Sequence, residues 1–160
     1  MGQILTSTRV FFVSFGPREE GFRAYIPLEA AFASSGELEV SMSQASTVYK
    51  RAIETILLRV EQIKLDRKSR KTISARRIWT IGNIIFKLLE NLKRKGFEID
   101  GVYDHFVRDI KVKKKWLEKV IILRRYVPDK MMIPNSLSWG QLEKGTGKKA
   151  KKLRIEFENY

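Results

Sequence analysis

The fold is decided by residues 106–120, which read Phe-Val-Arg-Asp-Ile-Lys-Val-Lys-Lys-Lys-Trp-Leu-Glu-Lys-Val. Apolar residues recur at helical spacing on both sides of the central Lys111-Val112-Lys113. The pattern predicts a short helix capped by Asp100, a tight turn at Lys111, and a further helix that ends at Pro128. The expected apolar positions are Val102, Tyr103, Phe106, Val107 and Ile110 in the first helix, and Trp116, Leu117, Val120, Ile121 and Leu123 in the second.

Two longer helices are expected before this pair. Ser43 is a suitable N-cap for a helix that runs to about residue 66, with apolar residues at helical spacing. A second long helix is predicted from residue 73 to residue 95, where Gly96 would end it in the left-handed conformation. The basic residues 67–72 connect the two long helices. Together with the short pair, they predict a four-helix core.

The N-terminal quarter has the composition of a small sheet. Residues 8–15 and 22–26 are rich in β-branched and aromatic side chains, and residues 16–21 have the Gly and Pro of a turn. Residues 37–42 alternate apolar and polar side chains, which predicts a third strand. Such a sheet needs a helix against one face to be stable.

The C-terminal part is expected to be less regular. Residues 138–142 predict a helical turn, residues 144–152 a flexible basic run, and residues 153–160 a strand that joins the N-terminal sheet. The predicted fold class is mainly α (α+β), with a four-helix core and a small N-terminal antiparallel β element. We expect three segments: a β-hairpin element over residues 1–42, a basic helical domain over residues 43–142, and a basic arm with a terminal strand over residues 143–160.

Positive charge is the strongest compositional feature. The 160 residues include 32 Lys and Arg against 18 Asp and Glu, a net charge of +14. Residues 1–42 hold three basic and five acidic side chains, a net charge of −2, whereas residues 43–96 hold fourteen and four, a net charge of +10. Such a balance favours an anionic polymer, an acidic protein or a membrane surface as partner, the alternative being a solvated basic surface without a ligand.

Several functional classes are disfavoured by composition. The chain has no cysteine, which excludes disulfides and thiolate metal sites and favours a reducing compartment. The single histidine, His105, argues against a histidine zinc site and a catalytic triad. No apolar run approaches the length of a membrane-spanning helix. We therefore expect a cytoplasmic protein with no metal, no cofactor and no membrane contact.

The paired short helices resemble the two-helix core of helix-turn-helix proteins. In that family an apolar residue precedes the turn, a valine or isoleucine follows it, and two apolar residues anchor the second helix; Ile110, Val112, Leu117 and Val120 match these positions. Two positions depart from the pattern. Lys111 stands where a glycine commonly takes positive φ, and Val107 stands where a small residue usually lets the helices approach.

A longer stretch, residues 76–142, resembles the helical N-terminal domain of the YhcG-type nuclease family. The matching features are Ile78-Trp79-x-Ile81-Gly82 and Gly96 on the long helix, Arg108-Asp109 and Leu123-Arg124-Arg125-Tyr126 at the ends of the next two helices, and Leu137-Ser138-Trp139 after a loop. The resemblance implies a winged-helix relative that binds DNA and is coupled to a separate PD-(D/E)xK nuclease domain. The residues after 142 are too few for such a domain, so the resemblance implies binding without cleavage.

A catalytic role is not favoured by the acidic residues. Asp109-Ile110-Lys111 has the letters of a D-x-K half-motif, with Asp100 and Asp104 upstream. Metal-dependent nucleases need carboxylates that converge on one ion. These three acids fall on a cap and a short helix, where they do not converge well, so we expect no enzyme activity.

Three groups of basic residues are candidates for phosphate contact. The first surrounds the start of the second short helix, where cations oppose the helix dipole unless an anion compensates. The second lies between and on the long helices, and the third forms the C-terminal arm. The candidates are Lys111, Lys113, Lys114, Lys115 and Lys119 in the first group; Arg67, Lys68, Arg70, Lys71, Arg76 and Arg77 in the second; and Lys148, Lys149, Lys151 and Lys152 in the third.

These observations predict a non-catalytic protein that binds double-stranded DNA through a helix-turn-helix unit, as a regulator or targeting subunit of a mobile-element or defence system. Residues 1–42 would serve self-association as a homodimer or docking of a protein partner. One alternative is a small helical subunit of an RNA-guided ribonucleoprotein that binds single-stranded DNA or RNA. An exposed Trp139 would suit base stacking in that role, although Trp79, Trp116 and Trp139 are all expected in the core. The other alternative is a structural adaptor for an acidic protein.

Overall fold

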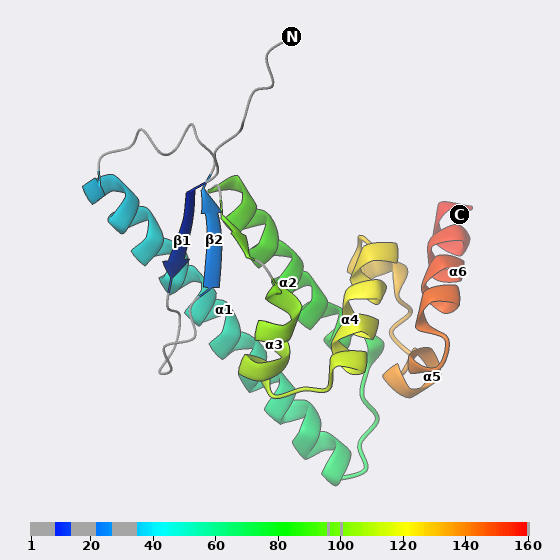
Figure 1. Cartoon of the computed structure of the whole chain (residues 1–160). Helices are drawn as coiled ribbons and strands as arrows, with labels where there is room; N and C mark the ends of the chain where they lie inside the picture. The colour runs from blue at the N-terminus through cyan, green and yellow to red at the C-terminus, as the bar shows by residue number, and fades with distance from the viewer. Residues whose placement is uncertain (1–8, 14–21, 27–34, 96, 100, 160) are drawn as a thin grey trace. The chain divides into compact units, whose positions relative to one another are not determined.

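The computed structural model describes residues 9–13, 22–26, 35–95, 97–99 and 101–159. These residues are mainly helical, as the sequence predicted (Figure 1). The helices are α1 (Ser35–Lys68), α2 (Ala75–Arg94), α3 (Val102–Ile110), α4 (Lys114–Tyr126), the 3-10 helix η2 (Lys130–Met132), α5 (Trp139–Glu143) and α6 (Thr146–Glu158).

The chain divides into two compact units, and each takes part of α1 and part of α2. The strand-bearing unit comprises residues 1–51 and 88–102, and the helical unit comprises residues 52–87 and 103–160. The strand-bearing unit contains β1 (Arg9–Val13), β2 (Phe22–Ile26) and β3 (Glu98–Ile99), which pair antiparallel in the order β1-β2-β3. Its buried apolar side chains among the described residues are Ala45, Tyr49, Leu88, Leu92 and Phe97.

The core of the helical unit is built from the apolar stripes of four helices. Each stripe follows the i, i+3, i+4 and i+7 spacing that places side chains on one helical face. A buried side chain of this kind contributes roughly 1.5–3 kcal/mol to folding. The stripes consist of Ile53, Ile56, Val60 and Ile63 on α1; Ile78, Ile81 and Ile85 on α2; Phe106 and Ile110 on α3; and Leu117, Val120 and Leu123 on α4.

The start of α2 is tied to the start of α5. The amide of Ala75 donates to the Leu137 carbonyl at 2.9 Å, and the amide of Trp139 donates to the Ile73 carbonyl at 2.7 Å. Ser138 caps α5 through a reciprocal pair of hydrogen bonds with Gln141. The helical turn predicted over residues 138–142 is therefore confirmed.

The strand predicted over residues 37–42 is wrong. These residues belong to α1, which begins at Ser35 and not at Ser43. No proline interrupts residues 35–68, and extending a formed helix adds one hydrogen bond for each residue that is fixed. The predicted turn at residues 16–21 and the predicted caps at Gly96 and Asp100 lie outside the described residues.

The prediction of a basic C-terminal arm with a terminal strand is also wrong, because residues 146–158 form α6. Thr146 and Ala150 are buried one helical turn apart. Pairs spaced i, i+4 add support: Arg154 donates to Glu158 at 2.7 Å, and Lys152 lies 3.5 Å from Glu156. The alternation of Leu153, Ile155 and Phe157 suggested a strand, but Ile155 and Phe157 are exposed on the helix.

Candidate nucleic-acid interface

The whole net charge of the protein falls within the helical unit. Residues 52–87 and 103–160 hold twenty-four Lys and Arg against ten Asp and Glu, a net charge of +14. The strand-bearing unit holds eight basic and eight acidic residues and is neutral. A polyanion would therefore be attracted to the helical unit.

Three residues, 111–113, join α3 to α4. Lys111 has φ 57°, the left-handed conformation that glycine adopts at little cost. Lys113 is extended, with φ −76° and ψ 139°, and its carbonyl accepts from the amides of Trp116 and Leu117 at the start of α4. The sequence pattern thus placed the left-handed residue correctly, although a lysine occupies that position.

The lysines around this turn differ in whether their ammonium groups are available to an external anion. Lys111, Lys113 and Lys115 are exposed, and in the part of the chain that the structure describes they form no ion pair. Lys114 instead donates to Asp104 on α3 at 2.8 Å. This hydrogen bond lowers the pKa of Asp104 and raises the pKa of Lys114. We call Lys111, Lys113 and Lys115 the turn lysines.

Lys119 also has a charged partner within the protein. It lies one turn after Lys115 and is partly buried, with its ammonium group 3.6 Å from the Glu143 carboxylate at the end of α5. Of the five lysines predicted around the second short helix, three are therefore available to an external anion and two, Lys114 and Lys119, are paired. Sequence alone gave no signal for this division.

A glycine sets the close approach of α2 and α4. A Cβ atom at Gly82 would lie 2.9 Å from the Val120 carbonyl oxygen and 3.0 Å from Arg124 Cβ. The first of these neighbours is backbone, which cannot move aside as a flexible side chain can. The close contact between α2 and α4 therefore depends on the absence of a side chain at position 82.

Arg124 fastens α4 to α2 beside this glycine. Its guanidinium carbon lies 4.3 Å from the centre of the Phe86 ring and 5.3 Å from the centre of the Trp79 ring. Its Nε donates to Asn83 Oδ1 at 2.9 Å, and Trp79 Nε1 donates to the Val127 carbonyl at 2.6 Å. Each cation–π contact contributes about 0.5–2 kcal/mol. Arg124 is therefore committed to internal packing.

Helix α6 covers a second face of α4. Gly147 lies against Ile122, and the Lys151 ammonium group sits 4.9 Å from the centre of the Tyr126 ring. The face left open on α4 carries Lys114, Glu118 and Arg125 at helical spacing, and all three are exposed. This face is mixed in charge, so the more strongly basic part of α4 is its N-terminal end.

Glu61 links the turn lysines to α1. Its pKa is lowered, first by a hydrogen bond from Lys64 at 2.7 Å and further by the positive charges of Lys111 and Lys68. One carboxylate on α1 thus lies within electrostatic reach of a residue on the α3–α4 turn and of the last turn of α1. Sequence reasoning placed Lys68 and Lys111 in separate groups.

Asp66 organises the basic residues at the start of α2. It is buried, accepts from Arg77 Nη1 at 2.6 Å and from Gln62 at 3.3 Å, and lies 3.9 Å from Lys71. The hydrogen bond from Arg77 is the main reason that the pKa of Asp66 is lowered. Arg76 donates to the Ile133 carbonyl at 2.6 Å. Both arginines thus have internal partners.

The remaining basic residues of this region face solvent. Arg67, Lys68 and Arg70 are exposed, and none of them forms an ion pair within the described ranges. Arg70 has φ 55° in the turn that follows α1. We call these three residues the α1-end cluster.

The four predicted lysines of the C-terminal segment lie on α6. Lys149 Nζ donates to the Gln141 carbonyl, Lys151 stacks on Tyr126, and Lys152 pairs with Glu156. Lys148 is exposed, and its ammonium group has no ion pair in the described part of the chain. These residues therefore project from a helix packed on α4, and three of the four have a partner among the described residues.

The described residues contain no group of three His, Cys, Asp or Glu side chains placed to hold a metal ion, and none of their helices is long and apolar enough to cross a membrane. Trp139 is 1% exposed and Trp79 is 8% exposed, as expected for core residues, whereas Trp116 is only partly buried, so its placement in the core was wrong. Trp139 therefore offers no surface on which a base could stack.

Comparisons of the chain with protein-family models, with curated proteins and with solved structures gave no match.

Proposed function

We propose that this protein is a non-catalytic double-stranded DNA-binding protein that uses the α3–α4 unit and the basic surface beside it. The observation that carries the proposal is the confinement of the whole +14 charge to the helical unit, together with three exposed lysines at the α3–α4 turn that form no ion pair with any described residue. A regulator or a targeting subunit of a mobile-element or defence system would need such a surface. We include in this proposal that residues 76–142 are related to the helical N-terminal domain of the YhcG-type nuclease family.

The proposed contact surface combines two clusters. The turn lysines lie at the N-terminus of α4, where the helix dipole also favours an anion. The α1-end cluster is proposed to extend this surface, since the charges of Lys68 and Lys111 both contribute to the lowered pKa of Glu61. In a helix-turn-helix arrangement, α4 would enter the major groove with its first turn, and the α1-end cluster would contact flanking phosphates.

The conformation of the turn supports this assignment. The left-handed residue at 111, the buried Ile110 before it and the buried Leu117 and Val120 after it occupy the expected order for such a unit. The burial of Trp139 removes one stacking surface from the alternative single-strand function. Residues 1–42 are proposed to serve self-association or partner docking and not DNA contact, since they carry a net charge of −2.

The test is a fluorescence anisotropy titration of matched duplex DNA, single-stranded DNA and RNA across a salt series. Six unpaired cations in the two clusters predict a log–log salt slope of about −5 on duplex DNA. The variant Lys111→Ala/Lys113→Ala/Lys115→Ala is expected to reduce that slope to about −3.

A matched control removes the same charge from the strand-bearing unit. Lys93, Arg94 and Lys95 are exposed, and their triple alanine variant is expected to leave the slope within experimental error. Equal loss in both triple variants would mean that net charge alone governs binding. A preference for single strands would favour the ribonucleoprotein subunit, and binding only to an acidic protein would favour the adaptor.

A further inference from the structure

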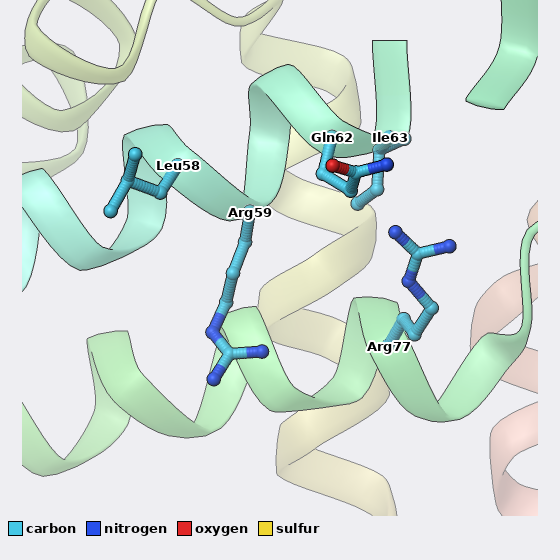
Figure 2. Close-up of a pocket in the computed structure, with 5 residues that line it drawn as sticks. All are labelled: Leu58, Arg59, Gln62, Ile63 and Arg77. Carbon is cyan, nitrogen blue, oxygen red and sulfur yellow. The ribbon is translucent and has the colours of Figure 1, made fainter. Parts of the chain in front are cut away.

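A pocket of about 190 Å³ lies between α1 and α2 in the helical unit. Figure 2 shows its five lining residues: Leu58, Arg59, Gln62 and Ile63 come from α1, and Arg77 comes from α2. Arg59 reaches from α1 toward α2, and Arg77 reaches from α2 toward α1 with its guanidinium group below the Gln62 amide (Figure 2).

The two arginines differ in whether another residue holds the guanidinium group in place. Arg59 is exposed and forms no ion pair among the residues that the structure describes. Arg77 is oriented by the 2.6 Å hydrogen bond from its Nη1 to Asp66 Oδ2. A guanidinium group carries five N–H donors, so this bond leaves most of those of Arg77 for another acceptor. One arginine is thus oriented by an internal hydrogen bond, whereas the other is exposed and has no ion pair among the described residues.

The local charge remains positive after the internal pair is counted. Arg59, Arg77 and Lys71 contribute three positive charges, and Asp66 removes one of them. The first turn of α2 contains no acidic residue and carries Arg76 and Arg77, although the positive end of the helix dipole disfavours cations there. An external anion would relieve this excess.

We propose that Arg59, Arg77 and Gln62 form a binding site for a phosphate group. Two guanidinium forks and one amide provide donors on two sides of the pocket, which matches the several acceptor oxygens of a phosphate. The phosphate is either that of a nucleic-acid strand or that of a small phosphorylated molecule. The first source rests on the proposed function, whereas the site itself does not.

The pocket also has an apolar wall, which can contact a group attached to the phosphate. The lining includes two apolar side chains, Leu58, which is 74% exposed, and Ile63, which is buried. A group attached to the phosphate, such as a sugar or a planar base, would cover this wall and remove apolar surface from water. A bare inorganic anion would leave the wall uncovered and is expected to bind more weakly than a phosphate ester.

The first experiment is a titration of the full-length protein with sodium phosphate at constant ionic strength. It is followed by ¹H–¹⁵N spectra of the arginine Nε–Hε groups. Saturable shifts are expected for Arg59 and Arg77 and not for Arg94. Arg59→Gln is expected to weaken phosphate binding by about tenfold, the effect of losing charge-assisted hydrogen bonds. Arg94→Gln removes the same charge from an exposed position on α2, outside the pocket and outside both proposed clusters, and is expected to change binding less than twofold.

Arg59→Lys separates charge from fork geometry, because lysine keeps the charge without bidentate donors. Its phosphate affinity is expected to fall between those of the wild type and Arg59→Gln. Non-saturable shifts in the wild type, or equal binding by the wild type and Arg59→Gln, would overturn the site. Far-UV circular dichroism of each variant checks that the helices are intact.

Duplex DNA then distinguishes the two sources of phosphate. If Arg59→Gln weakens duplex binding more than Arg94→Gln does, the pocket holds a phosphate of the nucleic acid. If phosphate binds saturably but both variants bind duplex equally, the pocket takes a small phosphorylated molecule. If the wild type binds phosphate but no nucleic acid, the site stands and the proposed function fails.

Discussion

Replacing Lys111 with glycine is expected to stabilise the protein while it weakens nucleic-acid binding. Lys111 has φ 57°, and the left-handed conformation costs a residue with a Cβ atom about 1–2 kcal/mol. Glycine removes that cost but has more conformational freedom in the unfolded chain, which offsets about 0.4–1 kcal/mol. The net gain relative to alanine at the same position is therefore about 0.5–1 kcal/mol.

The comparison with Lys111→Ala isolates the backbone contribution. Both variants lose the lysine charge and its interaction with Glu61, but only the glycine variant relieves the left-handed conformation. Urea unfolding followed by tryptophan fluorescence gives the free energy of unfolding for each. The gain corresponds to a rise of about 1–4 °C in the melting temperature. Both variants should also lower the salt slope on duplex DNA by about 0.9.

Lys113 provides the opposite control within the same turn. Its φ is −76°, which any residue adopts, so Lys113→Gly should be less stable than Lys113→Ala by about 0.4–1 kcal/mol. The two positions thus predict glycine effects of opposite sign only two residues apart. The reasoning would be refuted if Lys111→Gly proved no more stable than Lys111→Ala, because the turn would then not require a left-handed residue there.

Three further predictions concern packing, pH and the N-terminal quarter. Gly82→Ala should destabilise the protein by about 1–3 kcal/mol in urea unfolding, because the new Cβ would lie 2.9 Å from the Val120 carbonyl oxygen. The Asp66–Arg77 pair should stabilise the fold above the ordinary Asp66 pKa of 3.8, and that contribution should disappear as pH falls through the lower folded pKa. Removing residues 1–34, which leaves α1 whole, should change oligomeric state or partner binding, measured by light scattering, more than it changes duplex affinity.

Each of these predictions has a control. Gly140→Ala should cost little, since no described atom lies within 4 Å of the added Cβ. Asp66→Asn should reduce the loss of unfolding free energy at acidic pH. An unchanged dependence on pH would exclude the Asp66–Arg77 pair as its source. For the truncation, a large loss of duplex affinity with unchanged association would reverse the roles assigned to the two parts of the chain.

The sequence by itself determined the helical character and much of the local detail. Apolar spacing located α2, α3 and α4, and Pro128 correctly marked the end of α4. The family pattern identified Lys111 as the left-handed residue, since turn geometry depends on a few neighbouring residues. The positive charge of the chain was equally readable, because net charge requires no knowledge of the fold.

Prediction from local sequence failed where a segment fitted both the two-residue repeat of a strand and the 3.6-residue repeat of a helix. Residues 37–42 alternate like a strand, but they continue a helix that has no interruption, and the same holds for residues 153–158 in α6. In α6 the buried Ala150 and the contacts with α4 decide the structure, and these come from residues distant in sequence. Tertiary packing therefore overrode a weak local preference.

Only the tertiary structure decided which basic residues are available to a ligand. Lys114 and Lys115 are neighbours of the same type, but Lys114 is bound to Asp104, ten residues away, whereas Lys115 is unpaired among the described residues. Arg124 is committed to Asn83, 41 residues away. Hydrogen bonds and ion pairs depend on distances of a few ångströms between atoms, and the order of residues in the chain does not specify those distances until the helices have packed.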